Sequence, residues 1–451
     1  MAHPTQRAHA ISPDVEPTAS YRAHLDIMSA RLEAALEGTG FDGLVILAGD
    51  LQTPPRDDIP YAFRVEPHFA AWLPLNRVPG AALVLAPGRK PILLYPQPDD
   101  YWHSPPRDPK GLWVDDFDIR TIRTTAVESG DLTKLRAGFA LIGNAGGAAL
   151  PARFDERVLK RLDYDRAYKT DYEVACMRAA NRIAVRGHTR VSGAFAIGLS
   201  EFELNGLYCA ATRQRDAELP YANIVALNEH AAVLHYQHLD RAPPSVRRSL
   251  LIDAGAEFSG YAADVTRTWT SIQSPLAPLI DSMEQLQQTL CAEALCGVDF
   301  VALNERAHEL LADVLAAHDV VTCPAAEAHA SGLTRAFLPH GLGHLIGLQV
   351  HDAGGRQVSP DGEAKDPPTE HAYLRLTRVL ENGFVVTIEP GLYFIPSLLE
   401  RLTPELRAKV NWRTVEALLP YGGIRIEDDV LVQETTPRNL TREAFAACNT
   451  E

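Results

Sequence analysis

The stretch LLIDAGAEFSGYAADVTRTW, residues 250–269, contains two β-rich runs on either side of a turn at Ser259. This pattern predicts a β-hairpin. With the turn centred between Phe258 and Ser259, Asp253 and Asp264 are equidistant from it, so they should pair across the strands and point to one face. Two like charges 4 Å apart repel by roughly 4 kcal/mol at an effective dielectric of 20. A cation is therefore expected between them.

The hairpin alone leaves a second interpretation open, in which one aspartate is a turn residue and the other pairs with Arg267. Downstream, FLPHGLGHLIGLQVHDAGG supplies His340, His344 and His351. The H-x-x-x-H spacing is similar to the helical zinc motif H-E-x-x-H, but the second position is Gly341, and glycines disfavour a helix. We expect a loop that leads into a strand. Any one of these histidines could instead be a structural hydrogen-bonding residue.

Two further apolar runs each carry an acid and are predicted to be strands: 384–391 with Glu389, and 423–428 with Glu427. An unpaired carboxylate inside a buried strand is costly, so each needs a cation, a proton or a metal. For Glu427 the neighbour Arg425 is an alternative partner.

Taken together, these residues form an oxygen-rich set of four carboxylates and a histidine. Such a set suits two hard or borderline divalent ions, which also balance the four negative charges. Two ions roughly 3.5 to 4 Å apart can hold a bridging hydroxide and polarise a substrate carbonyl, so the sequence predicts a hydrolase.

The chain has 451 residues, which favours two domains. A helix is predicted at 21–36, and strands at 43–48, 81–86 and 92–95, so the first third is expected to be an α/β domain. We place the boundary before Arg166, giving domains 1–165 and 166–451.

In the second domain, Thr170 with Glu173 and Ser200 with Glu203 have capping-box spacing and predict two successive helices, the first ending near residue 195. One more helical stretch is expected at 282–318. The strand-like runs around it predict an α+β domain with antiparallel pairing.

The net charge of −15 disfavours nucleic acid as a partner. The sequence has no apolar leader segment and no run of about 18 apolar residues, so we expect no membrane association and a cytoplasmic location. Its six cysteines show no CxxC spacing and are expected to be reduced core thiols.

At these motifs the sequence resembles the pita-bread metallopeptidases, and within them the bacterial-type Xaa-Pro dipeptidases, or prolidases. The resemblance spans nearly the whole chain and includes RAYKTDYEVACMR, PYANIVALNEHAAVLHY, HGLGH, TIEPGLYF and GGIRIEDDV. It implies an α/β N-terminal domain followed by an α+β pita-bread catalytic domain. It also implies hydrolysis of dipeptides that end in proline.

The resemblance implies five metal ligands, with Asp264 and Glu427 bridging two ions: Asp253, Asp264, His344, Glu389 and Glu427. Mn²⁺ is the ion expected from the family, and Co²⁺, Fe²⁺ or Zn²⁺ also suit the ligand set. Glu389 together with His340 or His351 is expected to manage the protons of the reaction.

The resemblance also assigns residues to the substrate. His235 is expected to line the pocket, and Arg375 and Arg425 to lie near the carboxylate of the dipeptide. Arg375 could instead form a surface salt bridge, and Arg425 could be structural. Related enzymes are dimers, so Trp102 is expected to reach the partner's site, with packing inside its own domain as the alternative.

Three other functions remain open. An Xaa-Pro aminopeptidase would use the same ligands on longer peptides, and the presence of a full N-terminal domain disfavours a methionine aminopeptidase. A non-enzymatic binding module would show ligand substitutions, and none is present. The third is an enzyme that mainly hydrolyses organophosphate esters, although such hydrolysis would most simply be a side reaction of the same hydroxide.

Overall fold

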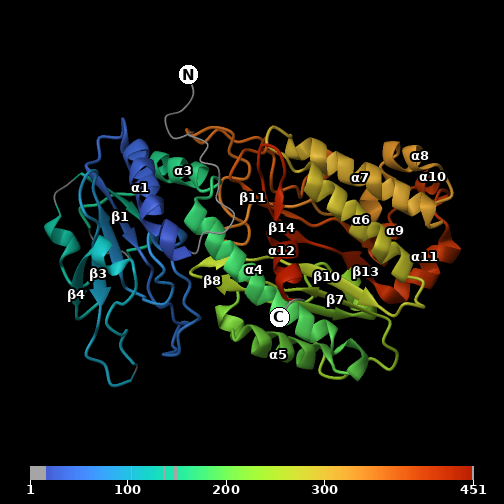
Figure 1. Ribbon diagram of the computed structural model, residues 1–451, viewed down its shortest axis with the longest axis horizontal. Helices are drawn as coiled ribbons and strands as arrows, with labels where there is room; N and C mark the ends of the chain where they lie inside the picture. Colours follow the sequence, from blue (N-terminus) through green and yellow to red (C-terminus); the bar gives the residue numbers. More distant parts are fainter. Residues whose placement is uncertain (1–16, 103, 136–137, 146–149, 449–451) are drawn as a thin grey trace.

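The computed structural model describes residues 17–102, 104–135, 138–145 and 150–448. The first part of the chain forms a five-stranded mixed sheet in the order β4-β3-β2-β1-β5 (Figure 1). Strands β1 and β5 pair in parallel, as do β3 and β4, and the other pairs are antiparallel. The bounds are β1 (Gly43–Leu47), β2 (Ala82–Leu85), β3 (Ile92–Pro96), β4 (Asp118–Ile122) and β5 (Phe139–Ile142).

Three helices belong to this α/β part, α1 (Pro17–Leu36), α2 (Pro67–Ala70) and α3 (Glu156–Asp165). Helix α1 buries Met28 and Leu32 in a core shared with β1 and β2, because its apolar residues recur at helical spacing. It also contacts α3 and the first helix of the second domain. The helix and the three strands predicted in this region are confirmed.

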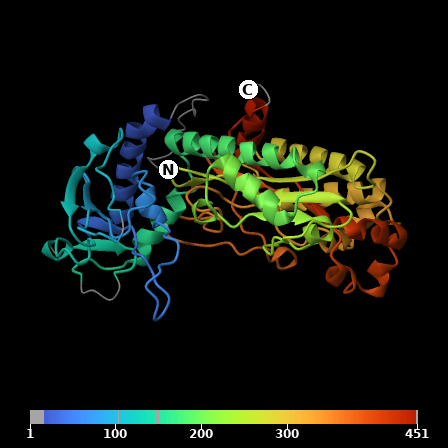
Figure 2. The same cartoon turned by 90° about the horizontal axis from the view of Figure 1, so that it is seen from below.

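Helices α4 (Asp171–Ser192) and α5 (Glu201–Thr212) begin the second domain. Both start at capping boxes. The side chains of Thr170 and Ser200 accept from the backbone amides of Glu173 and Glu203, and the carboxylates of these glutamates accept from the backbone amides of Thr170 and Ser200. Helix α4 extends along one side of the domain, starting beside α1 (Figure 2). Both predicted helices are confirmed.

The single helix expected at 282–318 is wrong. The structure has two helices there, α6 (Ala277–Glu293) and α7 (Phe300–Ala317). Helix α6 ends at its C-cap Ala294, whose ψ of 61° leaves the helical region, and Gly297 between the helices has a φ of 91°. Asp299 then caps α7 by accepting from the amide of Val301. The later helices are α8 (Ala325–Ala330), α9 (Pro396–Leu399), α10 (Pro404–Arg407), α11 (Trp412–Leu418) and α12 (Leu440–Cys448).

The strands of the second domain pair antiparallel, as predicted. They form sheets in the orders β10-β7-β6, β11-β14-β15, β12-β13 and β8-β9. The bounds are β6 (Ile224–Leu227), β7 (Ser249–Asp253), β8 (Glu257–Phe258), β9 (Tyr261–Ala262), β10 (Thr266–Thr270), β11 (Val385–Ile388), β12 (Gly391–Tyr393), β13 (Gly423–Arg425), β14 (Asp428–Leu431) and β15 (Arg438–Asn439).

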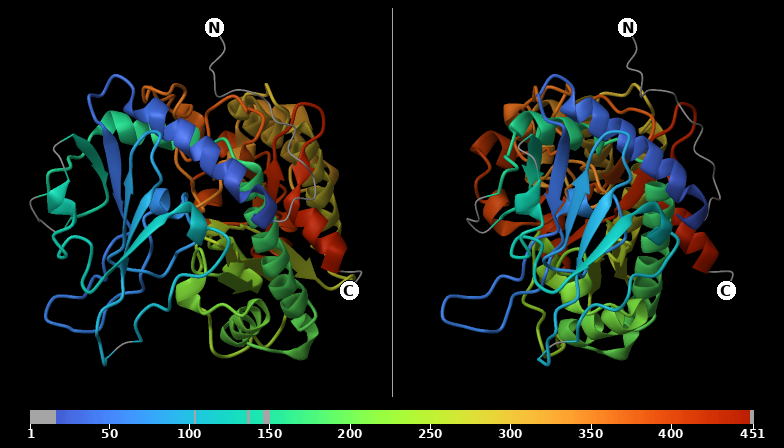
Figure 3. Two further views of the ribbon diagram at one scale, coloured as in Figure 1. Left: turned by 60° about the vertical axis from the view of Figure 1, so that its left-hand side comes forward. Right: turned by 90° about the vertical axis from the view of Figure 1, so that its left-hand side faces the viewer.

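Helices α6 and α7 lie on one side of these strands, and α4 and α5 lie on the other (Figure 1). Strands β11 and β14 are accordingly buried along their whole length. The five-stranded sheet forms a separate lobe at the end of the molecule (Figure 3). Of the acids singled out above, Asp253 ends β7, and the other three lie in short breaks between the strands of these layers.

Within the described part of the chain, no helix combines the length and apolarity that crossing a membrane requires. The six cysteines are free thiols. Cys176 and Cys291 are buried, whereas Cys296 is exposed, so the expectation of core thiols holds for only some of them.

Candidate metal centre

The hairpin at 250–269 exists, but its register differs from the one predicted. Asp253 pairs with Thr266, not with Asp264. The turn is formed by Ser259 and Gly260, with φ of 53° and 89°, so its centre lies one residue later than expected. Direct pairing of the two aspartates is therefore wrong. Since Asp264 lies two residues before Thr266, the two acids still share one face of the hairpin.

The HGLGH segment is a loop, as its glycines predict, but it does not continue into a strand. The next residue, Leu345, forms an isolated β-bridge with Val386. A side chain at Gly343 would come within 2.0 Å of the carbonyl oxygen of Thr387, so only glycine permits this close approach to β11. The amide of His344 donates to Thr387 Oγ1 at 3.1 Å, which fixes the histidine beside the strand.

The two glutamates lie between strands, not inside them as predicted. Glu389 is between β11 and β12, and Glu427 is between β13 and β14. The backbone of Glu427 forms a β-bridge with Thr266 of the hairpin, and the amide of Glu389 donates to the carbonyl of Leu342. Both breaks thus bring a carboxylate to the hairpin and the histidine loop.

Three of the five expected ligands form a compact buried group. One ligand atom each of Asp264, His344 and Glu427 lies within 4.8 Å of the other two. His344 Nδ1 is 3.0 Å from the carbonyl of Leu345, so Nδ1 carries the proton and Nε2 is available as a ligand. His344 Nε2 is 3.6 Å from Asp264 and 3.7 Å from Glu389.

The fifth expected ligand, Asp253, has a cationic partner at only one of its two carboxylate oxygens. Its Oδ2 accepts from Arg425 Nη2 at 2.6 Å. Its Oδ1 is buried and has no hydrogen-bond partner among the described residues. A buried carboxylate oxygen without a donor is costly, and a metal ion would satisfy it.

The electrostatics of the group indicate the same need. Burial, and then the neighbouring acids, raise the pKa values of Asp264 and Glu427 well above the ordinary carboxyl range. Burial raises the pKa of Glu389 to about 8 and lowers the pKa of His344 to about 3. A neutral histidine among crowded carboxylates fits divalent cations, because metal binding needs these donors deprotonated.

Residues around the acids support them in ways that sequence reasoning missed. Tyr221 donates to Asp264 Oδ1 at 2.5 Å, and Thr266 Oγ1 donates to Glu427 Oε2 at 2.6 Å. The buried carboxylate of Asp429 accepts from the amide of Asp264 at 3.2 Å. Tyr221 lies in the PYANIV run and Asp429 lies two residues after Glu427, but nothing local in the sequence marks either as a partner.

His340 and His351 both lie beside the centre. His340 Nδ1 is 2.9 Å from the carbonyl of Gly341, so Nδ1 carries the proton and Nε2 accepts from the hydroxyl of Tyr393 at 2.8 Å. Its Nδ1 is also 3.8 Å from Glu389. The His351 ring is perpendicular to that of His344, with centroids 4.5 Å apart. Burial lowers the pKa of each of these two residues to about 4.

The expected substrate residues differ in their surroundings. Arg375 is exposed, and its charge lowers the pKa of Glu389 and of His351, so it lies near both. It has no acidic partner among the described residues. Arg425 is buried and donates to Asp253 and to Tyr393, an arrangement that favours its structural alternative.

His235 is exposed, and its charge lowers the pKa of His340 and of His351, so it faces the same site. Trp102 lies on a loop of the N-terminal lobe with its side chain 77% exposed and its ring 5.1 Å from that of Tyr101. Packing inside its own domain therefore does not account for Trp102.

Comparison with known proteins identifies the group to which this site belongs. Residues 175–434 match the family model of metallopeptidase family M24, and residues 19–164 match that of the Xaa-Pro dipeptidase N-terminal domain. The chain belongs to metallopeptidase family M24. This M24 peptidase is accordingly a metal-dependent hydrolase with the predicted architecture of an α/β N-terminal domain and a pita-bread catalytic domain.

Curated relatives of this M24 peptidase cover nearly its whole length. The Xaa-Pro dipeptidase of Xanthomonas euvesicatoria is 46% identical over 432 residues, which are 95% of this chain and 98% of the relative. That of Stenotrophomonas maltophilia is 46% identical over 439 residues, 96% and 99% of the two chains. The resemblance to Xaa-Pro dipeptidases is thus confirmed.

Solved structures with the same fold include aminopeptidases P. The E. coli enzyme with the inhibitor Pro-Leu has a TM-score of 0.70 at 23% identity, covering 96% of this chain and 99% of its own. Proline aminopeptidase P II from Yersinia pestis has a TM-score of 0.68 at 22% identity, covering 96% and 100%. At these identities the likeness concerns the fold alone.

Proposed function

We propose that this M24 peptidase hydrolyses Xaa-Pro dipeptides with two divalent ions held by Asp253, Asp264, His344, Glu389 and Glu427. The observation that carries the proposal is the buried group of Asp264, His344 and Glu427, with Glu389 beside it and a partnerless oxygen on Asp253. Four carboxylates in so small a buried volume need more positive charge than Arg425 supplies.

Mn²⁺ is the proposed ion, and Co²⁺, Fe²⁺ and Zn²⁺ suit the same donors. When bound, a pair of such ions lowers the pKa of a water molecule and polarises the substrate carbonyl. Asp264 and Glu427 are the proposed shared ligands. Tyr221 and Thr266 orient these two carboxylates through their hydroxyl hydrogen bonds.

Proton transfer is assigned to Glu389, His340 and His351. The prolyl nitrogen leaves well only when it is protonated, so a general acid is required. Glu389 is suited to this role by its place, because its carboxylate lies 3.8 Å from His340 Nδ1 and 3.7 Å from His344 Nε2. His340 is held by Tyr393 and Gly341, and His351 has no hydrogen bond from its ring among the described contacts, so His351 is freer to meet the substrate.

Arg375 is the proposed clamp for the carboxylate of the dipeptide. Its guanidinium is exposed beside the site and has no acidic partner among the described residues. A guanidinium binds a carboxylate through two charge-assisted hydrogen bonds, which would select substrates that end directly after proline. His235 is proposed to line the same pocket. Arg425 is proposed to hold Asp253 instead of the substrate.

The remaining features concern assembly. Residues 1–165 and 166–451 are proposed as the two domains, with the first contributing to a homodimer. The exposed ring of Trp102 would then line the partner's site. A cytoplasmic location and a small dipeptide as substrate complete the proposal.

The test is substrate length. The Mn²⁺-loaded enzyme is assayed with Ala-Pro, Ala-Pro-Ala and longer Xaa-Pro peptides. Preference for Ala-Pro supports the dipeptidase, whereas preference for the longer peptides supports an Xaa-Pro aminopeptidase, which would use the same ligands. A paired measurement of kcat/KM for an organophosphate triester and for Ala-Pro tests whether ester hydrolysis is only a side reaction.

A further inference from the structure

A buried glutamate away from the metal centre has no role in the chemistry described above. Glu201 is the first residue of α5, and its side chain is 1% exposed. It has no arginine or lysine partner in any described contact. A buried carboxylate is stable only if donors satisfy its lone pairs, and the N-terminus of a helix adds a favourable dipole.

Four donors satisfy the carboxylate of Glu201, and all of them come from one short segment. Oε1 accepts from the amide of Leu227 at 2.8 Å and from His230 Nδ1 at 2.7 Å. Oε2 accepts from the hydroxyl of Tyr236 at 2.6 Å and from the amide of Asp240 at 2.8 Å. With its lone pairs used in this way, Glu201 does not act as a metal ligand although His230 and Asp240 lie close by.

Glu201 thus binds Leu227, the last residue of β6, and three residues of the loop 228–240 that follows, which we call the His235 loop. Asn228 and Leu239, near its two ends, have φ of 58° and 51°. Leucine rarely adopts this left-handed conformation, so the surrounding contacts must impose it. The bond from Asp240 to Glu201 lies directly after Leu239. The amide of Phe202, in the first turn of α5, closes the same end by donating to the carbonyl of Asp240 at 3.2 Å.

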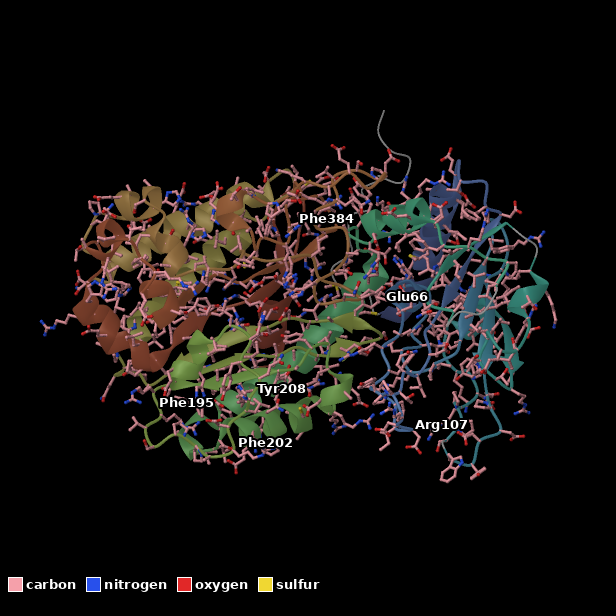
Figure 4. All side chains as sticks on the ribbon, turned by 180° about the vertical axis from the view of Figure 1, so that it is seen from behind. Glu66, Arg107, Phe195, Phe202, Tyr208 and Phe384 are labelled. Atoms are coloured by element: carbon pink, nitrogen blue, oxygen red, sulfur yellow. The ribbon has the colours of Figure 1, made fainter. Side chains whose placement is uncertain are left out.

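On the side away from α5, the His235 loop lies near the metal centre. Its start lies against β13, the strand that leads into Glu427, and a side chain at Gly422 would meet the carbonyl of Asn228 at 2.4 Å. Tyr236 is buried toward Glu201, whereas the adjacent His235 is exposed on the side of His340 and His351. Phe202, next to Glu201, lies at the outer edge of the molecule (Figure 4). The loop therefore spans the distance from α5 to the site.

We propose that Glu201 is a positioning residue that holds the His235 loop against α5 and so places His235 in the substrate pocket. The proposal rests on the proposed function of His235. Glu201 acts through the loop and touches neither substrate nor metal.

The substitution Glu201→Gln tests this role with little change in volume. Each carboxylate oxygen accepts from one backbone amide, so either orientation of the new side-chain amide places an NH₂ against a backbone N–H. Glu203→Gln is the matched control, since Glu203 lies in the same helical turn, is exposed and bonds to Ser200. In wild type and both variants, amide hydrogen exchange is measured across 228–240.

We expect exchange in the His235 loop to rise about tenfold or more in E201Q and to stay at the wild-type rate in E203Q. With Ala-Pro as substrate, kcat/KM should fall roughly 10- to 100-fold in E201Q, because displaced groups lose the reacting geometry. H235A should show a similar loss, and E201Q/H235A should be no worse than the lower single variant.

Losses that multiply in the double variant, or wild-type loop exchange in E201Q, would overturn the proposal. If E201Q does not fold, Tyr236→Phe removes only one of the four bonds, and it must show the same non-additivity with H235A. If the wild-type enzyme does not hydrolyse Ala-Pro, the proposed function fails, while the exchange comparison still decides the role of Glu201.

Discussion

Removing Arg425 should destabilise the metal-free protein. The Arg425 side chain is 5% exposed, and its guanidinium donates to Asp253 at 2.6 Å and to Tyr393 at 2.9 Å. Histidines aside, it is the one basic side chain among the described residues within salt-bridge distance of the carboxylates of the site. In Arg425→Leu, Asp253, whose side chain is only 14% exposed, loses its cation. Its Oδ1 already has no partner, so both oxygens would be unsatisfied.

The magnitude follows from the cost of breaking a buried ion pair, about 3–5 kcal/mol. If residues 166–451 unfold as one unit of ~290 residues, the entropy of unfolding is about 0.6 kcal/mol/K at about 2.1 cal/mol/K per residue. The melting temperature in EDTA should then fall by about 5–8 °C. Arg375→Leu is the matched control, because it removes the same charge from an exposed position without an acidic partner, and its shift should be within about 1 °C.

The assay is differential scanning calorimetry of wild type and both variants, dialysed against EDTA. Equal melting temperatures for wild type and Arg425→Leu would refute the reasoning, since Arg425 would then not stabilise Asp253. A shift of equal size in Arg375→Leu would refute it as well, because the loss would then reflect overall charge.

Three other predictions concern the same site. From pH 6.5 to pH 8 the melting temperature in EDTA should fall, because Glu389, with a folded pKa of about 8, stabilises the protein only while it is protonated. With saturating Mn²⁺ the melting temperature should not fall over this pH range. Arg375→Ala should raise KM for Ala-Pro about 10- to 100-fold and leave kcat/KM for Ala-Pro amide nearly unchanged, as steady-state kinetics would detect. Tyr221→Phe should weaken Mn²⁺ binding about tenfold or more in calorimetric titrations, because Asp264 loses its orienting hydroxyl.

Features of the fold that depend on nearby residues could be predicted from the sequence. The capping boxes at Thr170 and Ser200 begin helices where expected, since both partners lie within four residues. The break between α6 and α7 was missed because the C-cap of α6, Ala294, is a residue type that favours helices, and Gly297 is the one strong stop signal between the two helices. The predicted hairpin register was wrong because the turn places Ser259 in a left-handed conformation, which serine does not usually adopt.

Partners far apart in the sequence could not be predicted. Arg425 is next but one to Glu427, yet it binds Asp253, 172 residues away. Arg267 was a candidate partner for the hairpin acids and instead binds Asp428 at 2.6 Å. The four donors to Glu201, one at the end of β6 and three in the His235 loop, become neighbours only when this loop folds back on α5. The set of ligands was recognisable from sequence mainly because its motifs resemble those of a known family, whereas each pairing depends on the tertiary structure.

Metal content measured alongside activity tests the central claim most directly. Wild type, His344→Ala and Glu427→Ala are loaded with Mn²⁺, desalted and analysed by inductively coupled plasma mass spectrometry, and the same samples are assayed with Ala-Pro. We predict about two ions per wild-type chain with activity, and fewer than one ion per chain with no turnover in each variant. Full activity with one ion per chain, or retained activity in either variant, would contradict the five-residue, two-ion site.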